Sequence, residues 1–307
     1  MRICSLLPSA TEILFALGLG EDVVGVSHEC DFPPAARAKR RVIETVIDQQ
    51  RLSSREIDVI VRRHIQEKRS LYRLDEAALL ELRPELIVTQ ELCDVCAIDA
   101  PTVLRSVSRL PSPPAIVSLH PHTLDGLFED IRTLGQATGT RAHAQRVVEQ
   151  LRARLDRIRE RLAHAGTPRR VACLEWMEPL MNAGHWVPEM VQRAGGRDPL
   201  SEIGKPSVVI TWAQLVEAQP EVLVLMPCGF PIARTRRELS VLTNRPEWQA
   251  LPAVEQGQVY AVDGPAYFNR SGPRLIDGTE LLAGLFYPQV CGDLIPAGSV
   301  ERCRATK

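Results

Sequence analysis

The sequence lacks the features that would place it in several large functional classes. None of its apolar runs approaches the ~20 residues that a transmembrane helix needs. A formal net charge of −1, with no basic stripe carrying interleaved aromatic residues, gives no reason to expect nucleic acid as a partner. There is also no phosphate-binding loop and no glycine fingerprint of a dinucleotide site. These absences argue against a membrane-spanning protein, a nucleic-acid-binding protein and a nucleotide-dependent enzyme.

A catalytic set is also missing. Ser9, Ser27 and Ser118 do not lie in the strand–turn–helix sequence of a nucleophile elbow. Glutamate and histidine residues are present, but their spacing does not assign an acid and a base. We therefore expect a protein that is not an enzyme.

The amino-terminal residues do not have the order of a secretory signal peptide. The short apolar run after Met1 and Arg2 is interrupted at Pro8, and no small-residue cleavage site follows it. Taken as it stands, the chain is predicted to be cytoplasmic; removal of a leader would make it periplasmic instead. In a reducing compartment its 8 cysteines are expected to be thiols and not disulfides.

Strand-like and helix-like segments alternate in two blocks, residues 1–122 and 166–307. Such alternation predicts a parallel sheet with helices on both faces. At 307 residues the chain is long enough for two domains. The predicted fold class is α/β, with two three-layer α/β lobes whose sheets are parallel.

The segment between the two blocks, residues 123–165, has no strand signal. Its helical periodicity is broken at Gly139 and resumes over 141–163 for about six turns. We therefore predict a helical connector, a long rigid helix that joins an amino-terminal lobe (1–122) to a carboxy-terminal lobe (166–307).

Four polar clusters follow directly on strand-like segments. In open α/β sheets, ligands bind in the crevice outside the carboxyl ends of the strands. These clusters are therefore expected to face a ligand cleft between the lobes. Their candidate binding residues are His28, Glu29, Cys30, Asp31, Glu91, Cys93, Glu175, Trp176 and Cys228.

Two further segments carry candidate contacts. His185 and Trp186 follow Trp176 closely, and two indoles beside a carboxylate and an imidazole suit a large flat ligand with polar edges. The alternative for Trp186 is that it only anchors the helix that follows it. Tyr267 and Asn269 precede the last predicted helix and would hang over the cleft.

The cysteines support a different reading of the same clusters. Thiolates in a Cys-x-x-Cys pair can clamp a zinc ion or the iron of an iron–sulfur cluster, and the candidate ligands are Cys30, Cys93, Cys96 and Cys228. The alternative is that Cys96 faces the core while Cys93 lines a pocket. Cys4 and Cys173 lie within apolar strand patterns, which predicts that they are core residues.

Four stretches of the sequence resemble the periplasmic-binding-protein family for cobalamin and ferric siderophores. They are residues 7–18 (LPSATEILFALG), 24–27 (VGVS), 82–88 (LRPELIV) and 269–274 (NRSGPR). The resemblance implies a class III fold, in which two α/β lobes are joined by one rigid helix and the ligand lies between them. Residues 27–31 and 91–93 resemble the subgroup of cobalamin-binding proteins, and Tyr267 would then form an aromatic wall of the site.

We therefore expect a binding protein for cobalamin or a related corrinoid, working with an ABC-type permease. His28, Glu91, Trp176, His185 and Tyr267 would touch the ligand, and His28, His185 or Cys228 could coordinate cobalt. Surface acids such as Glu44 or Glu238 could contact the permease. The alternative is a zinc- or iron–sulfur-binding protein or enzyme that uses the four cysteines on the same scaffold.

Overall fold

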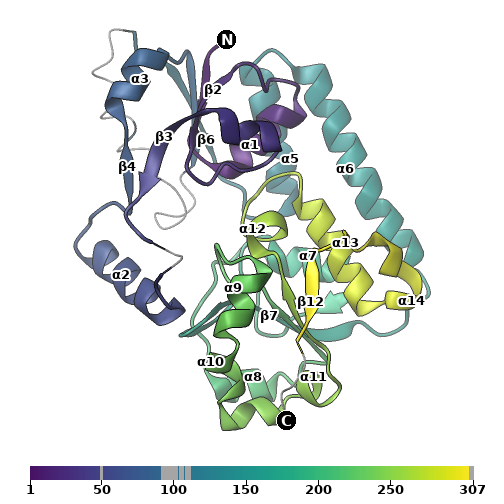
Figure 1. The fold of residues 1–307 in the computed structure, drawn as a ribbon. Helices are drawn as coiled ribbons and strands as arrows, with labels where there is room; N and C mark the ends of the chain where they lie inside the picture. The colour runs from purple at the N-terminus through teal and green to yellow at the C-terminus, as the bar shows by residue number, and fades with distance from the viewer. Residues whose placement is uncertain (49–50, 91–102, 104–106, 108–111, 304–307) are drawn as a thin grey trace. The chain divides into compact units, whose positions relative to one another are not determined.

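The structure is a computed structural model that describes residues 1–48, 51–90, 103, 107 and 112–303 (Figure 1). Its contacts divide the chain into two units. Unit 1 comprises Met1–Leu52, Glu56–Pro121 and Asp125–Gln150, and unit 2 comprises Ser53–Arg55, His122–Leu124 and Leu151–Lys307.

Unit 1 is built on a six-stranded sheet of order β4-β3-β2-β1-β5-β6. All neighbouring strands run parallel except β3 and β4, which pair antiparallel at one edge. Most of these strands are rich in β-branched residues, which pack well on a pleated surface. Their bounds are β1 Ile3–Ser5, β2 Val23–Ser27, β3 Arg40–Thr45, β4 Tyr72–Leu74, β5 Leu86–Gln90 and β6 Ala115–Leu119.

Helices connect the strands of this sheet, and two more, α5 and α6, follow its last strand in the chain. Their bounds are α1 Pro8–Ala16, η1 Pro34–Ala38, α2 Ser54–Gln66, α3 Glu76–Leu82, α5 Leu124–Ala137 and α6 Arg141–Arg161. The sequence also predicts a helix over 101–109, and this segment lies largely outside the described residues. Only Val103 and Val107 of this segment are described, and both are helical and buried.

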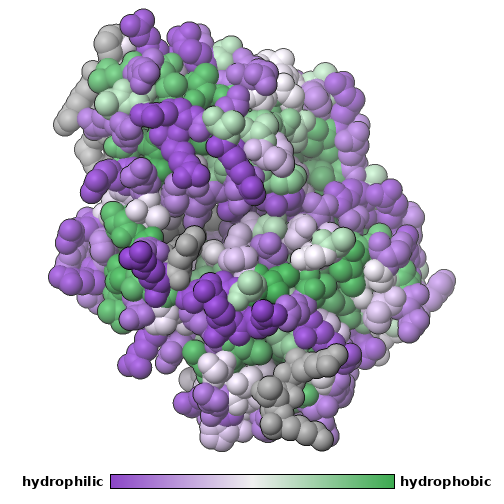
Figure 2. Space-filling view, viewed as in Figure 1, coloured by the Kyte–Doolittle hydropathy of each residue, from purple (hydrophilic) through white to green (hydrophobic). Residues whose placement is uncertain are grey.

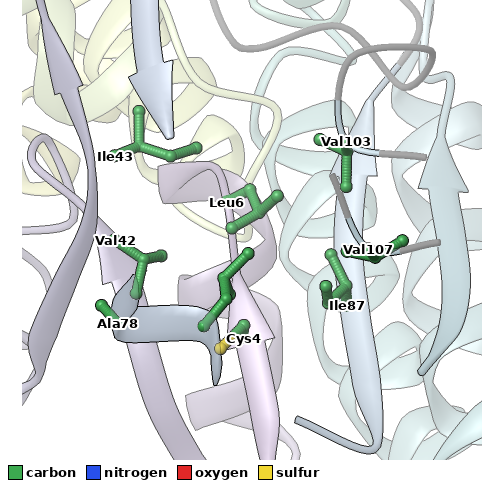
Figure 3. Packing of buried hydrophobic residues seen from close by; sticks show 9 residues of the cluster. Cys4, Leu6, Val42, Ile43, Ala78, Ile87, Val103 and Val107 are labelled. Carbon is green, nitrogen blue, oxygen red and sulfur yellow. The ribbon is translucent and has the colours of Figure 1, made fainter. Parts of the chain in front are cut away.

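One apolar cluster of unit 1 joins buried side chains from several strands and helix α3. Cys4 and Leu6 meet Val42 of β3 and Ile87 of β5 in this cluster, as the close view shows (Figure 3). Cys4 is fully buried, and burial raises the pKa of its thiol to about 12. The prediction that Cys4 is a core residue is confirmed.

Helix α1 begins earlier than its sequence suggests. The order Ser9-Ala10-Thr11-Glu12 has the form of a capping box, in which Ser9 would be the residue before the helix. In the structure the helix begins at Pro8, and its N-cap, Leu7, makes no side-chain capping bond. Proline suits a first helical turn because the missing N–H has no partner there in any case.

Unit 2 contains a second sheet, of order β12-β11-β10-β7-β8, with β9 paired to β7. The central strands β7, β10 and β11 are parallel, whereas β8 and β12 join the two edges antiparallel. The bounds are β7 Arg169–Met177, β8 Leu180–Asn182, β9 Gly196–Arg197, β10 Val222–Leu225, β11 Val259–Val262 and β12 Val300–Arg302.

Short helices surround this sheet, and the longest of those that follow β7 is α13. Their bounds are α7 Val187–Arg193, α8 Trp212–Glu217, α9 Ile232–Glu238, α10 Ser240–Thr243, η2 Pro246–Ala250, α11 Pro252–Glu255, α12 Gly264–Tyr267, α13 Leu275–Phe286, α14 Pro288–Cys291 and η3 Gly292–Leu294. Arg154 of α6 ties into α13 through Asp277 and Glu280, with 3.0 Å between its Nε and Glu280 Oε1. Cys173 lies in the core of this unit, as predicted.

The fold class predicted from the sequence is confirmed in its main features and corrected at the sheet edges. Both sheets have parallel centres, but their outer strands β4, β8 and β12 are antiparallel, so neither sheet is purely parallel. The connector consists of two helices, α5 and α6. The break lies at Gly139, whose φ of +74° glycine adopts without strain. The lobe boundaries at 122 and 166 stay a prediction.

The visible surface is mixed in character. Hydrophilic side chains predominate on the face that Figure 2 shows, with separate apolar patches between them. Among the described residues, no helix is both long and apolar enough to cross a membrane.

Candidate functional site

The candidate site residues of unit 2 gather at the carboxyl edge of its sheet. Glu175 and Trp176 lie among the last residues of β7, which ends at Met177. Cys228 follows β10, and Tyr267 ends the short helix α12 that follows β11. Three neighbouring parallel strands thus deliver these side chains to one edge, as the sequence predicts for a ligand site in an α/β sheet.

Glu175 is the centre of a hydrogen-bonded cluster at this edge. Its Oε2 accepts from the backbone N–H of Gly184 at 3.2 Å, and its Oε1 accepts from the Ser207 hydroxyl at 3.3 Å. Its backbone carbonyl accepts from the N–H of Cys228 at 3.0 Å, which ties β7 to the end of β10. Burial raises the pKa of the Glu175 carboxyl, and the two donors oppose that effect. Such a group can present a hydrogen bond to a polar ligand edge.

Trp176 supplies an aromatic surface beside this carboxyl. Its side chain is half-buried, and its ring centroid lies 5.2 Å from that of Phe230 at an interplanar angle of 55°. The indole N–H donates to the carbonyl of Glu178 at 3.0 Å. Because the N–H and one face have partners, the indole is held in place while part of it stays accessible.

Trp186 stands at the N-cap of helix α7. It is only 7% exposed, and its indole N–H donates to the carbonyl of Phe268 at 2.7 Å. This burial does not test the predicted ligand contact, which stays a prediction. It agrees with the alternative, in which Trp186 anchors helix α7.

Asn269 also connects backbone segments. Its Nδ2 donates to the carbonyl of Met226 at 3.2 Å, and its Oδ1 accepts from the N–H of Gly229 at 3.3 Å. The side chain therefore fixes the turn that carries Cys228. We interpret Asn269 as a residue that shapes the site, and its predicted contact with ligand stays a prediction.

His185 and Tyr267 complete the group in unit 2. Both are half-buried. Burial lowers the pKa of His185, as does His122, whose ring centroid is 5.6 Å away. Burial, followed by the charge of Asp277, raises the pKa of the Tyr267 phenol. Near pH 7 both side chains are neutral, which suits contact with a largely apolar ring system.

In unit 1, His28 and its neighbours follow β2 as predicted. The His28 backbone N–H donates to the carbonyl of Ile43 at 3.1 Å, and its ring lies 6.0 Å from that of Tyr72. His28 Nδ1 is buried without a hydrogen-bond partner, and burial lowers the pKa of the imidazole. Glu29 and Asp31 are half-buried.

The thiol of Cys30 is a buried group and not an open ligand. It is 4% exposed, and the Thr11 hydroxyl lies 3.1 Å from its sulfur. The same hydroxyl lies 2.8 Å from that of Ser5, so the three side chains form a buried polar chain in unit 1.

The cysteine-based metal site finds no support. Glu91, Cys93 and Cys96 lie outside the described residues. Across the part of the chain that is described, no group of three or more His, Cys, Asp and Glu side chains is placed to hold a metal ion. Cys30 belongs to unit 1 and is buried, whereas Cys228 belongs to unit 2 and is half-buried.

Sequence reasoning missed two contributors to this edge. Ser207 lies in the loop before α8, 32 positions from Glu175, and nothing in its local sequence signals the hydrogen bond to that carboxylate. His122 lies between β6 and α5 and carries no motif. Only the folded chain places these residues beside Glu175 and His185.

A sequence profile described as periplasmic binding protein matches residues 3–266. The chain belongs to this family. Family membership agrees with the two-lobe class III fold and with the expectation that the protein is not an enzyme but a substrate-binding protein.

Two curated relatives of this binding protein align over nearly its whole length. A vitamin B12-binding protein of Vibrio cholerae is 27% identical over 282 residues, which cover 91% of this chain and 86% of the relative. An uncharacterized ABC transporter substrate-binding lipoprotein of Bacillus subtilis is 23% identical over 292 residues, which cover 94% of this chain and 80% of the relative.

A solved structure has a similar fold. The periplasmic heme-binding protein of Pseudomonas aeruginosa superposes with a TM-score of 0.70 at 22% identity, covering 94% of this chain and 93% of its own. The Bacillus subtilis relative is named a lipoprotein and the Pseudomonas aeruginosa protein is named periplasmic, so the expected cytoplasmic location of this binding protein finds no support.

Proposed function

We propose that this protein binds cobalamin or a related corrinoid outside the cytoplasm and presents it to an ABC-type permease. The observation that carries this proposal is the cluster at the carboxyl edge of the unit 2 sheet. There a half-buried indole, a phenol and a carboxyl gather at one sheet edge, in a chain that is similar to a vitamin B12-binding protein over 91% of its length.

The chemistry of the cluster suits a corrinoid. A corrin is a large ring with amide side chains at its rim, so it needs an aromatic surface and hydrogen-bonding groups beside it. Trp176 and Tyr267 would supply the aromatic contact. Glu175, whose pKa is raised by burial, would accept from or donate to a rim amide.

Haem is the second candidate ligand. It is also a flat metal-containing tetrapyrrole, and the similarity to a heme-binding protein supports it at the level of the fold. The imidazole of His185, the phenol of Tyr267 and the thiol of Cys228 are side chains of this cluster that could bind iron.

The two acids expected to contact a permease differ in their exposure. Glu44 is exposed on β3. Glu238 is buried and accepts a hydrogen bond from Arg234, so it is not available as an exposed docking charge.

Titration calorimetry with cyanocobalamin, hydroxocobalamin, hemin and a ferric siderophore tests the proposal. We expect saturable binding of a corrinoid, and an affinity at least tenfold weaker in Trp176→Ala with partial recovery in Trp176→Phe. Trp248→Phe is the matched control, because Trp248 is buried in η2 of the same unit, away from this edge. If no corrinoid binds with a Kd below ~100 μM, about −5.5 kcal/mol, the corrinoid assignment is wrong. Tighter binding of hemin would favour the second candidate.

A further inference from the structure

Two histidines from distant parts of the sequence lie side by side in unit 2. The rings of His122 and His185 have their centroids 5.6 Å apart at an interplanar angle of 41°. Neither imidazole has a hydrogen-bond partner among the side chains and backbone groups that the structure describes. His122 is exposed and His185 is half-buried, so the pair is reachable from solvent.

Specific contacts hold the two histidines together. The backbone N–H of Leu124, two residues after His122, donates to Glu189 Oε2 of α7 at 2.9 Å. The N–H of Gly204 donates to the carbonyl of His185 at 2.9 Å, and a Cβ at position 204 would lie 3.7 Å from the Thr123 side chain. These contacts fix both ring-bearing segments to the same part of unit 2.

His185 has an unusual backbone conformation. Its φ is +53°, in the left-handed region that residues other than glycine seldom adopt. Two hydrogen bonds maintain this conformation: the His185 N–H donates to the Lys205 carbonyl, and the His185 carbonyl accepts from the Gly204 N–H. Strained backbone of this kind is concentrated at functional sites, where it directs a side chain.

The distance between the rings suits shared coordination. Two imidazoles that bind one ion at ~2.0–2.1 Å per nitrogen place their ring centroids about 5–6 Å apart. Neutral imidazole is the form that binds metals, and burial favours that form at His185. The described residues contain no cluster of three or more metal-ligating side chains, so an ion held by these two imidazoles would keep its other positions open.

We propose that His122 and His185 together coordinate a transition-metal ion through their imidazole nitrogens, with its remaining positions filled by exchangeable water when the ion is free and by the macrocycle when it is the metal of a tetrapyrrole. The ion could arrive free in water or as the metal centre of a bound tetrapyrrole. The second source rests on the proposed function, and the first does not. This site differs from the cysteine site considered above in its ligands and its place in the fold.

Calorimetry with Zn²⁺, Ni²⁺ and Cu²⁺ alone tests the first source. We expect the wild-type protein to bind at least one of these ions, most tightly Cu²⁺, and His122→Ala and His185→Asn each to weaken that binding at least tenfold. Asparagine is chosen at position 185 because it tolerates the left-handed backbone. His164→Ala is the matched control, since His164 is an exposed histidine after α6. Thermal unfolding of each variant checks that it is folded.

The absorption spectrum of hemin mixed with the same four proteins tests the second source. If the pair binds the metal of a tetrapyrrole, the Soret band of hemin should shift when hemin is mixed with the wild type or with His164→Ala. With His122→Ala and His185→Asn, hemin should still bind, but the shift should be smaller or absent. If neither ion affinity nor the spectrum differs between these two variants and the control, the proposal is overturned. Retained corrinoid binding in that case would leave the proposed function standing.

Discussion

Glu189 and Leu124, sixty-five positions apart, are joined by a buried hydrogen bond. The N–H of Leu124 donates to Glu189 Oε2 at 2.9 Å, while the other carboxylate oxygen of Glu189 accepts from Arg193 at 3.1 Å. The first of these bonds fixes the segment His122–Leu124 within unit 2, immediately before the chain enters the part of α5 that belongs to unit 1.

We expect Glu189→Ala to lower the free energy of unfolding by about 1.5–3 kcal/mol, because a buried N–H loses a charged acceptor. Glu189→Gln should cost less, since its one carbonyl oxygen can keep one of the two bonds. Chemical denaturation of the two variants measures the difference. Equal stability of Glu189→Ala and the wild type would contradict a structural role for this bond.

Asp130 of α5 should make the stability of the protein depend on pH. Burial raises the pKa of this carboxyl to about 7. The backbone N–H of His120 donates a hydrogen bond to the carboxyl and offsets part of that rise. Because the folded pKa lies above the unfolded value near 3.8, the folded state binds more protons between these values. Stability from this group is therefore full below pH ~4 and is lost as the pH rises through about 7.

Asp130→Asn should remove that part of the pH dependence. At pH 8 we expect the variant to be more stable than the wild type by about 1–3 kcal/mol, since a neutral amide replaces a buried charge and can still accept the His120 bond. At pH 4 the two proteins should be nearly equal. Urea unfolding of both proteins at pH 4 and pH 8 provides the comparison. If the difference in stability between the variant and the wild type is the same at both pH values, Asp130 is not the source of this pH dependence.

Arg154 and Arg157 lie three positions apart on α6 and should respond very differently to truncation. Arg154 is partly buried and paired with both Asp277 and Glu280, which together raise its pKa. Arg154→Ala leaves two carboxylates near each other without their cation, and we expect a loss of about 1–3 kcal/mol in unfolding free energy.

Arg157→Ala is the control for that variant. Arg157 is exposed and has no ion pair or hydrogen bond within the described ranges, so its truncation should change stability by no more than about 0.5 kcal/mol. Thermal or denaturant unfolding of both variants, at low and at high salt, gives the comparison. A loss as large in Arg157→Ala as in Arg154→Ala would rule out the proposed role of the pairing.

The two indoles at the site should separate stability from binding. Trp186→Ala removes a buried ring and its bond to the Phe268 carbonyl, so about 3–5 kcal/mol of stability should be lost. Trp186→Phe should lose about 1 kcal/mol for that bond and leave ligand affinity within twofold of the wild type. Trp176→Ala should show the reverse pattern, with a smaller loss of stability and a larger loss of affinity. Denaturation and calorimetry on the same preparations distinguish the patterns.

Several elements were predictable because their causes are local. The apolar runs at Ile3–Ser5, Leu86–Gln90 and Val222–Leu225 form central strands, and the break at Gly139 follows from a glycine between two helical patterns. Strand β3 was missed, and so were the edge strands β4, β8 and β12, because strands of three residues are too short to show a period of two. The start of α1 was misplaced, because Pro8 at the first turn prevailed over the capping pattern after it.

The candidate site was predictable only in part. The carboxyl ends of β7, β10 and β11 meet at one edge because parallel neighbours must align them, so the placement of Glu175, Trp176 and Cys228 at that edge could be predicted from the sequence. Their contact with a ligand stays a prediction. The distinction between Trp176 and Trp186 could not be found, because burial depends on Phe230 and Phe268, which lie far along the chain.

The sequence by itself determined the two α/β blocks, the helical segment between them and the residue types at the strand ends, since these follow from local periodicity and turn chemistry. Tertiary structure alone decided which of those side chains are anchors and which stay accessible. It also brought Ser207 to Glu175 and His122 to His185. The physical reason is that a hydrogen bond or a ring contact depends on distance in space, which the order of residues does not fix for partners so far apart along the chain.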